Sequence, residues 1–360
     1  MRSLKILTVV GARPQFVKAA ALSPVLARQD GVAEVIVHTG QHFDANMSDI
    51  FFSEMAIPEP RHNLGIGGGT HGQNTGRMIE ALEAVLLAEV PDAVVVYGDT
   101  DSTLAAAVAT SKLAVPLAHI EAGLRSFRRT MPEEINRVVT DHLADVLYAP
   151  SVSAVANLKR EGIPQDRIVN CGDVMHDVVR LFTTIAMQRS AALDRLGLLP
   201  GEYNLMTLHR KENTDDRARL ESILDGIAAS PRPIVFPVHP RTTKRLAEFG
   251  LKLPRIVRTI EPQGYLDTLR LEASAHQILT DSGGVQKEAY FHGVPCVTLR
   301  DETEWVELVE SGANMVVGAD SARIAACLTG SALMNAKPNI YGDGRAAERI
   351  VDDLLKRLRP

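Results

Sequence analysis

The sequence predicts an α/β protein with two doubly wound, Rossmann-like domains that face a central cleft. Short apolar runs alternate with longer amphipathic segments, which is the pattern of parallel strands covered by helices. The alternation restarts after a cluster of helix breakers, Gly197-Leu-Leu-Pro200-Gly201. The chain has 360 residues, of which 45% are hydrophobic, and this is enough material for two separate cores.

Each domain contributes one series of predicted strands, and every strand is followed by helix-like sequence. The first series is Ile6–Val10, Val35–His38, Ala93–Tyr97, Val115–Ile120 and Val146–Ala149. The second series is Leu205–Leu208, Ile234–Val238, Ile256–Ile260, Ile278–Thr280, Cys296–Leu299 and Met315–Val317. Nearly continuous apolar runs of this length are typical of strands that are buried on both faces.

A long helical stretch, from Met175 to about Leu196, connects the two series. We place the domain boundary near residue 172, which gives an N-terminal domain of residues 1–172 and a C-terminal domain of residues 173–343. A last helix is predicted from about Gly344 to Leu358, and we expect residues 344–360 to pack back on the first domain.

Composition argues against several classes of protein. The 39 Lys and Arg against 44 Asp and Glu give a formal charge of −5, which disfavours a nucleic-acid partner. The three cysteines, Cys171, Cys296 and Cys327, show no CxxC spacing and leave one unpaired, so they indicate neither a disulfide scaffold nor a zinc site. A reducing cytoplasm is the expected location. No apolar run approaches the ~20 residues of a membrane span, so we expect no membrane association.

Unusual polar clusters directly follow six of the predicted strands. Because the carboxyl ends of parallel strands share one edge of a sheet, and ligands bind at that edge, these clusters predict a binding cleft. The clusters are Gly11–Gln15, Gly98–Asp101, Glu121–Arg125, His209–Lys211, His239–Arg241 and Asp281–Gly284.

The segment Ser282-Gly283-Gly284 opens a helix and predicts a phosphate site. Glycines leave the backbone amides accessible, and the positive end of the helix attracts an anion. The alternative is a tight turn in which glycine only supplies special dihedral angles. Glu288, one turn further on, is a candidate for the ribose hydroxyls or, alternatively, a carboxylate stabilised by the helix dipole.

Cationic and imidazole side chains provide further phosphate candidates. Arg13 and Lys18, at the first turn and on the first helix, can neutralise a diphosphate or can be ordinary surface cations. His209 and His239 each end a strand, where the alternatives are a loop histidine and a contact to phosphate or the leaving group. We favour His209 over His239 for the second role.

Asp99, Glu121 and Glu133 lie in the first domain and are candidates for acid–base chemistry, because they converge on one sheet edge. For Glu133 there is a structural alternative, since Thr130-Met-Pro132-Glu133 has the pattern of a capping box.

Two motif matches carry less weight. Gly67-x-Gly69-x-x-Gly72 has the dinucleotide fingerprint but follows Pro58-Glu-Pro60 rather than a clear strand, so we interpret it as a mobile loop without NAD. Asp99-Thr100-Asp101 resembles a metal clasp, but Asp101 also suits the N-cap of a helix over Ser102–Lys112. We therefore expect neither a cofactor nor a required metal.

Ten ordered blocks, spread through essentially the whole chain, resemble those of the non-hydrolysing UDP-N-acetylglucosamine 2-epimerases. The blocks are Gly11–Lys18, Gly40–His42, Gly98–Thr100, His119–Arg125, Pro132–Arg137, His209–Arg210, Pro237–His239, Thr280–Ala289, Arg300–Glu304 and Tyr341–Gly344. The resemblance implies a glycosyltransferase-B type fold, a UDP-sugar substrate, a homodimer and a place in surface polysaccharide synthesis.

The resemblance also implies roles for individual residues. It places the UDP portion against Arg13, His209, Ser282, Gly283, Gly284 and Glu288. It places the sugar and proton transfer with Lys18, Asp99, Glu121 and Glu133. Arg137 and His239, which belong to two of the blocks, are expected to help bind the substrate.

Departures from the family pattern favour one branch. Ala12 and Gln15 replace the Thr and Glu of many members, and His38–Ser48 and Asn213–Asp216 are similar to the enzymes acting on UDP-2,3-diacetamido-2,3-dideoxyglucuronate. UDP-N-acetylglucosamine is the alternative substrate. Some bacterial members are activated by a second substrate molecule, held by an arginine that aligns within Gly65–Gly72. This run contains no arginine here, which argues against such activation.

The chemistry explains why such residues are needed. The C2 hydrogen of an N-acetylhexosamine is not adjacent to a carbonyl, so a carboxylate alone cannot remove it. The family eliminates UDP to a 2-acetamidoglucal and adds it back, and inversion then requires acid–base groups on both faces of C2. A UDP-sugar glycosyltransferase, a hydrolytic variant and a non-catalytic sensor remain alternatives. We expect the Gly65–Gly72 and Ser126–Thr130 segments to move during domain closure.

Overall fold

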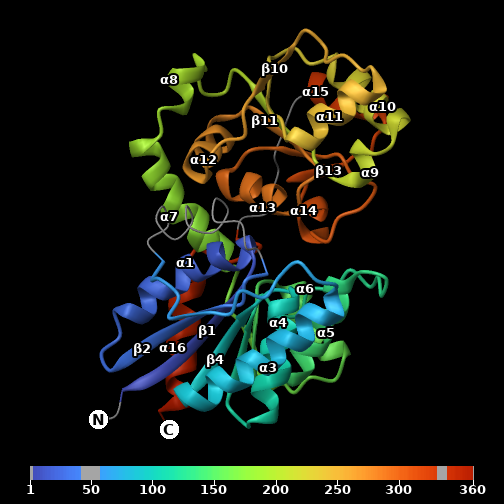
Figure 1. Ribbon diagram of the computed structural model, residues 1–360. Helices are drawn as coiled ribbons and strands as arrows, with labels where there is room; N and C mark the ends of the chain where they lie inside the picture. The colour runs from blue at the N-terminus through green and yellow to red at the C-terminus, as the bar shows by residue number, and fades with distance from the viewer. Residues whose placement is uncertain (1–2, 42–56, 331–338, 360) are drawn as a thin grey trace. The chain divides into compact units, whose positions relative to one another are not determined.

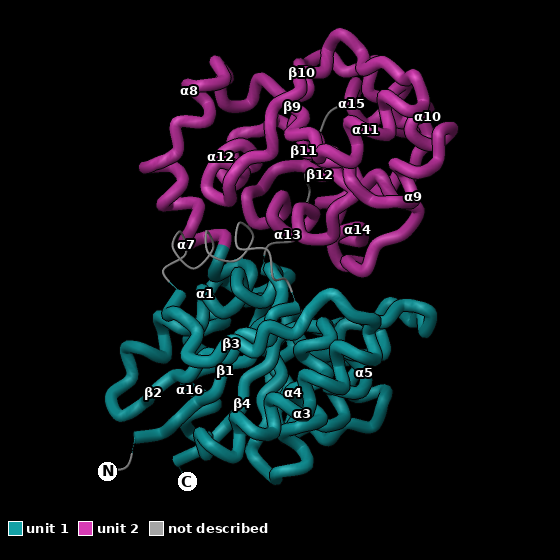
Figure 2. The backbone as a smooth tube through the Cα atoms, viewed as in Figure 1, with its two compact units in different colours: residues 1–178, 339–360 teal, residues 179–338 magenta. Residues whose placement is uncertain are grey.

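The computed structural model describes residues 3–41, 57–330 and 339–359, and the chain divides into two compact units (Figure 2). Unit 1 comprises Met1–Val178 and Asn339–Pro360, and unit 2 comprises Val179–Pro338. The division falls inside helix α7 (Val174–Arg189), later than residue 172. Among the described residues, no helix combines the length and the apolar character that a bilayer span requires.

Unit 1 is built on a parallel sheet of seven strands in the order β3-β2-β1-β4-β5-β6-β7. The strands are β1 (Leu4–Val10), β2 (Val32–His38), β3 (His62–Asn63), β4 (Ala93–Tyr97), β5 (Leu117–Ile120), β6 (Val146–Ala149) and β7 (Ile168–Asn170). All five strands predicted for this domain are present. The sequence analysis missed β3 and β7, which are only two and three residues long.

Helices cover both faces of this sheet (Figure 1). They are α1 (Arg13–Ala27), α3 (His71–Glu89), α4 (Asp101–Lys112), α5 (Pro132–Leu143), α6 (Val152–Arg160) and α16 (Ala346–Leu358), with a 3₁₀ turn at Gln165–Arg167. The strand order runs one way from β1 and the other way from β4, so right-handed crossovers place α1 and α4 on opposite faces. Helix α16 packs against α1.

Unit 2 has the same architecture, with a parallel sheet of six strands in the order β10-β9-β8-β11-β12-β13. The strands are β8 (Asn204–Thr207), β9 (Ile234–Pro237), β10 (Val257–Ile260), β11 (Gln277–Thr280), β12 (Cys296–Thr298) and β13 (Asn314–Val316). Its helices are α8 (Ala192–Leu196), α9 (Lys211–Thr214), α10 (Arg217–Ile227), α11 (Pro240–Phe249), α12 (Tyr265–Ser274), α13 (Gly283–His292), α14 (Val306–Glu310) and α15 (Ser321–Thr329). The predicted fold class, two doubly wound Rossmann-like units, is confirmed.

The helical stretch predicted from Met175 to about Leu196 is present but divided, because α7 ends at Arg189 and α8 begins at Ala192. Ser190 lies at the break. Its hydroxyl accepts the amide of Ala192 at 3.2 Å and contacts Asp267 Oδ1 at 2.5 Å. A serine side chain that bonds local backbone in this way competes with the helix.

Gly123 allows the loop after β5 to approach α6. Its φ is +81°, and a Cβ built there would lie 2.5 Å from the carbonyl oxygen of Ala154. Gly162 has the same φ of +81° but no neighbouring atom within 4 Å of such a Cβ. We therefore expect Gly123→Ala to lower the free energy of unfolding by about 2–4 kcal/mol and Gly162→Ala by only about 1 kcal/mol. Urea unfolding of both variants measures the difference, and equal losses would contradict the steric account.

Candidate functional site

Both units place polar residues at the point where their strand order reverses. In unit 1 this point lies between β1 and β4, which lead into Gly11–Arg13 and Gly98–Asp99. In unit 2 it lies between β8 and β11, which lead into His209 and Asp281. Open α/β sheets bind ligands at such switch points.

A buried ion pair occupies the unit 1 switch point. Lys18 on α1 contacts Glu121, which directly follows β5, and each side chain is only 9% exposed. A Cβ at Gly98 would lie 3.1 Å from both Glu121 Oε2 and Lys18 Nζ, so glycine allows the β4 turn to approach the pair. Glu121 itself has a φ of +69°, a conformation that costs a non-glycine residue energy and is enriched at functional sites.

Asp99 lies beside this pair and binds Arg137 of α5, with Arg137 Nη2 and Asp99 Oδ2 2.5 Å apart. Burial raises the pKa of Asp99, the charges of Arg137 and Lys18 oppose this effect, and the charge of Glu121 adds to it. The pKa of Asp99 therefore depends on all three of these neighbouring charges. We call Lys18, Asp99, Glu121 and Arg137 the acid cluster. The Asp99 side chain keeps 30% of its surface exposed, so it remains accessible to a ligand.

Glu133 lies apart from the acid cluster's contacts. It is exposed on the first turn of α5 and makes no hydrogen bond or ion pair to other residues that the structure describes. The predicted capping box is wrong, because the N-cap is Met131, whose side chain accepts no hydrogen bond from the amides of α5. Glu134 instead accepts the amides of Ser126 and Phe127 at 2.9 and 2.8 Å, so it fixes the loop before α5.

A second buried network holds the turn at Gly98, which leads from β4 to Asp99. His119 contacts Asp141 Oδ1 through Nδ1 at 2.7 Å and the carbonyl of Gly98 through Nε2 at 2.8 Å. Arg125 bridges Asp141 and Glu161, at 2.7 Å from each. Burial raises the pKa of Asp141, but His119 and Arg125 outweigh it, and the pKa lies below its usual value. The sequence analysis did not single out this network.

At the unit 2 switch point, Asp281 holds the turn that carries His209. It accepts the backbone amides of His209 and Arg210 at 3.1 and 2.9 Å and the side-chain amide of Asn213 at 3.2 Å. The imidazole of His209 is 47% exposed. The predicted phosphate ligand is thus accessible on a turn that these hydrogen bonds hold.

Ser282 is the N-cap of α13, and its side chain bonds no amide of that helix. Gly283 and Gly284 form the first turn, which contains no acidic residue. A Cβ at Gly283 would lie 2.4 Å from Glu304 Oε1, so any side chain there would require the Glu304 carboxylate to move. Glu288 follows on the same helix and is 8% exposed.

His239 serves a structural purpose in unit 2. It is the N-cap of α11, and its Nδ1 accepts the amide of Arg241 at 3.2 Å. Arg13 is the exposed first residue of α1 in unit 1. Asp101 is not the N-cap predicted for α4, because Thr100 caps that helix by accepting the amide of Thr103 at 3.3 Å.

Comparison with known proteins adds to this geometry. The family model described as UDP-N-acetylglucosamine 2-epimerase matches residues 25–355. The chain belongs to this family. It is 51% identical, over 98% of its own length and 100% of the relative, to a Pseudomonas aeruginosa protein named UDP-2,3-diacetamido-2,3-dideoxy-D-glucuronate 2-epimerase. It is 45% identical to the Methanocaldococcus jannaschii protein named UDP-N-acetylglucosamine 2-epimerase, over 97% and 98% of the two chains.

Solved structures of the family share the fold along almost the whole chain. The M. jannaschii epimerase in complex with UDP-GlcNAc and UDP superimposes with a TM-score of 0.86 at 44% identity, covering 98% of this chain and 100% of that one. The Neisseria meningitidis epimerase bound to UDP-GlcNAc gives a TM-score of 0.88 at 32% identity, with coverages of 98% and 100%. These neighbours have the glycosyltransferase-B type fold that the resemblance implied.

Gln15 links the first turn to β4. Its Oε1 accepts the amides of Gly11 and Ala12 at 2.8 and 3.0 Å, and its Nε2 donates to the carbonyl of Tyr97 at 3.1 Å. A carboxylate cannot make the last of these bonds. The family block at residues 40–42 is described only as far as Gln41, and residues 42–48 of the branch motif lie outside the described residues.

Side chains of α3 and its N-cap anchor the loop that resembles a dinucleotide fingerprint. Asn74 bonds both the amide and the carbonyl of Gly69 at 3.1 Å, and Thr70 caps α3. His71 contacts Asp101 Oδ2 at 2.7 Å, while Asn136 donates to the other carboxylate oxygen at 3.3 Å. Both oxygens of Asp101 are therefore engaged within unit 1. Movement of this loop stays a prediction.

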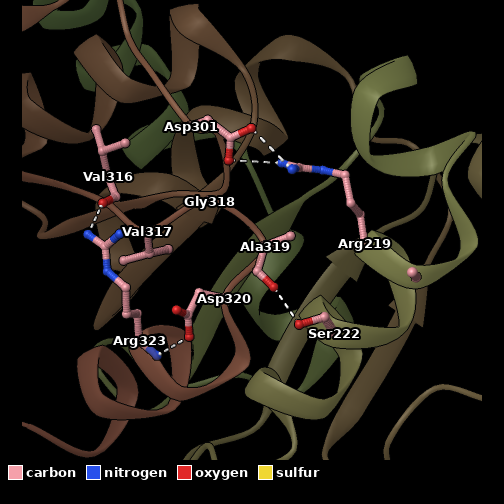
Figure 3. A pocket seen from close by; sticks show the side chains of 10 residues that line it. Arg219, Ser222, Asp301, Val316, Val317, Gly318, Ala319, Asp320 and Arg323 are labelled. Atoms are coloured by element: carbon pink, nitrogen blue, oxygen red, sulfur yellow. Dashed lines mark hydrogen bonds and ion pairs between the residues drawn. The ribbon is translucent and has the colours of Figure 1, made fainter.

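Unit 2 also contains an open pocket of about 730 Å³ between α10, α15 and the segment after β13 (Figure 3). The two arginines of this pocket contact other residues that line it. Arg219 pairs with Asp301 at 3.1 Å, and Arg323 donates to the carbonyl of Val316 at 2.5 Å. The Ser222 hydroxyl likewise bonds Ala319 at 2.5 Å. None of the predicted site residues lines this pocket.

A buried carboxyl lies behind α13. Glu272 on α12 is 0% exposed, and neither of its oxygens has a hydrogen-bond partner among the described residues. Burial and the charge of Glu288 raise the pKa of Glu272 well above its usual value. His292 Nε2 lies 3.7 Å from Glu272, and burial lowers the pKa of His292 to about 4.

We expect Glu272→Gln to stabilise the protein increasingly as the pH rises. The folded wild type keeps a proton that the unfolded chain releases near its ordinary pKa of about 4.3, so wild-type stability falls above that pH. Glutamine cannot ionise and removes this loss. Between pH 5.5 and 8, the gain of the variant over wild type in urea unfolding should grow by at least about 1 kcal/mol. A constant difference across this range would contradict the assignment.

Proposed function

We propose that the protein is a UDP-sugar 2-epimerase, which inverts C2 of a UDP-N-acetylhexosamine by eliminating UDP and adding it back. The observation that carries this proposal is the acid cluster. Two carboxylates, Asp99 and Glu121, stand beside two cations at the switch point of a chain that belongs to the epimerase family. This arrangement supports proton removal from and return to one carbon.

Elimination breaks the bond between C1 and the diphosphate oxygen, and the electron pair leaves with UDP. A carboxylate takes the C2 proton, and a double bond forms between C1 and C2. Readdition of UDP, with protonation of C2 on the opposite face, gives the epimer. We assign the two proton-transfer roles to Asp99 and Glu121, assisted by Lys18 and Arg137, and keep Glu133 as a third candidate because it is exposed near the same sheet edge.

The departing diphosphate gains negative charge, and donors aimed at it lower the barrier. In unit 2, we assign this task to His209 and to the amides of Ser282, Gly283 and Gly284. Glu288 is proposed to bind the ribose, Arg13 to add charge to the diphosphate, and His239 to contact the substrate through the ring edge that does not cap α11. No redox cofactor or metal enters this scheme.

We propose UDP-2,3-diacetamido-2,3-dideoxyglucuronate as the substrate and UDP-N-acetylglucosamine as the second candidate. The 51% identity to the P. aeruginosa protein of that name, together with Ala12 and Gln15, favours the first. The M. jannaschii relative, at 45% identity, favours the second. The two sugars differ at C3 and C6, so the enzyme's kcat/KM for each, measured side by side, decides between them.

The test of the function is incubation of the purified protein with each UDP-sugar alone, followed by NMR of the anomeric signals. An epimerase produces a second UDP-linked signal without an acceptor. A glycosyltransferase leaves the substrate unchanged, and a hydrolase releases free sugar and UDP. We further propose a cytoplasmic homodimer, and light scattering during size-exclusion chromatography tests the dimer.

A further inference from the structure

The two carboxylate oxygens of Asp281 differ in how many hydrogen bonds they accept. Asp281 is 0% exposed. Its Oδ2 accepts from the amides of His209 and Arg210 and from the side chain of Asn213, at 2.9 to 3.2 Å. Within the described residues, Oδ1 accepts a single hydrogen bond, from the amide of His209 at 3.2 Å. A lone pair of Oδ1 is therefore available to a further donor.

The imidazole of His209 is the group that faces this oxygen. Its Nδ1 lies 3.4 Å from Asp281 Oδ1, which is slightly beyond a hydrogen bond and typical of catalytic pairs before a ligand is bound. The two ring nitrogens lie on different edges of the ring, so Nε2 is directed away from the carboxylate. With 47% of the side chain exposed, the outer edge is accessible to a ligand.

Asp281 also connects His209 to the anion site on α13. It directly precedes Ser282, the N-cap of that helix, and its own amide bonds the carbonyl of Thr207 at 3.3 Å. The hydroxyls of Thr207 and Thr280 lie 2.6 Å apart and join the ends of β8 and β11 at the same level. One buried residue thus fixes both proposed diphosphate ligands of unit 2 relative to each other.

We propose that Asp281 is a positioning residue that keeps a proton on Nδ1 of His209, so that a doubly protonated ring donates from Nε2 to the diphosphate. This inference rests on the proposed function. A neutral imidazole carries one N–H, which beside a carboxylate belongs on Nδ1 and would leave Nε2 as an acceptor. A diphosphate offers only acceptors, so His209 binds it through Nε2 when both nitrogens carry protons. The cation between two anions then stabilises the charge that develops on UDP.

The first test uses the wild-type protein and needs no activity. In ¹⁵N-labelled protein saturated with UDP, the NMR shifts of His209 should show both ring nitrogens protonated. In the Asp281→Asn complex, only one nitrogen should carry a proton. Asp216→Asn is the matched control, because Asp216 also accepts two backbone amides, those of Ala218 and Arg219, but contacts no histidine. A singly protonated His209 ring in the wild-type complex would overturn the proposal.

The second test is a double-mutant cycle on kcat. We expect Asp281→Asn and His209→Asn each to lower kcat by about 10²-fold, as is usual for a lost leaving-group donor. If Asp281 acts through His209, the double variant should be no slower than His209→Asn alone. A kcat of the double variant lowered by about 10⁴-fold, the product of the two single losses, would show a separate structural effect of Asp281 and overturn the proposal. The kcat of the control, Asp216→Asn, should stay within about threefold of wild type.

Different results would contradict the proposed function and the proposed role of Asp281. If the wild type epimerises no UDP-sugar, the proposed function is wrong, and the same cycle measured on UDP affinity, together with the NMR result, decides the role of Asp281. If the wild type is an epimerase and the losses in the cycle multiply, only the role of Asp281 is wrong.

Discussion

Glu121→Gln and Asp99→Asn are each expected to slow epimerisation by about 10²–10⁴-fold, the usual contribution of a general acid or base. UDP affinity should change by less than about threefold, because we assign most of the UDP contacts to residues of unit 2. Both substitutions keep the size of the side chain and remove only its charge and proton-transfer capacity. Epimer formation by NMR and UDP binding by calorimetry measure the two effects, and solvent deuterium exchange at C2 should fall in parallel.

The same experiment needs a control for folding and a test of Glu133, the third candidate for proton transfer. Glu121→Gln leaves the Lys18 ammonium without its carboxylate in a place where both side chains are 9% exposed, so the melting temperature must be measured as well. Glu80→Gln, at an exposed position of α3, is the matched control and should behave as wild type. Glu133→Gln shows whether the third carboxylate takes part. Wild-type exchange in Glu121→Gln or Asp99→Asn would remove that residue from proton transfer.

Asp141→Asn is expected to destabilise unit 1 by about 3–5 kcal/mol at pH 7, because it removes one member of a buried charge network. His119 and Arg125, whose side chains are 0% and 1% exposed, would lose the carboxylate that they share. Asp145→Asn is the matched control: Asp145 is exposed and accepts a single amide, that of Leu117, at 2.8 Å. A loss no larger than that of the control in urea unfolding would contradict the account.

The pH dependence of this effect follows from the direction of the pKa shift. The pKa of Asp141 is lower in the folded protein than its ordinary value of about 3.9, so the stabilisation is complete above that pH. It is lost as the pH falls through the lower, folded-state pKa. The difference between wild type and Asp141→Asn should therefore be constant near neutrality and narrow below about pH 4.

Much of the fold could be predicted from apolar runs, because strands buried on both faces leave a clear pattern. Ala93–Tyr97 and Val146–Ala149 were predicted to the residue. The two-residue β3 and the three-residue β7 are too short and too exposed to leave that pattern. The break at Ser190 also went unpredicted, since it depends on a bond to Asp267, far along the chain.

The candidate site was predictable where it follows from the ends of strands, as for Asp99, Glu121, His209 and Ser282. The groups that hold these residues in place could not be predicted from the sequence. Asp281 and His209 are 72 positions apart, and His119 and Asp141 are 22 apart, so only the folded sheet brings each pair together. The role of Glu134 was missed for a similar reason: only the folded loop shows that its side chain turns toward Ser126 and Phe127.

The most direct measurement is NMR of wild-type protein incubated in D₂O with a UDP-N-acetylhexosamine and no acceptor. We predict a UDP-linked C2 epimer that carries deuterium at C2 and reaches equilibrium with the starting sugar nucleotide. Formation of the epimer with the original hydrogen retained, or of free sugar and UDP alone, would contradict the assignment of this chain as an eliminating 2-epimerase.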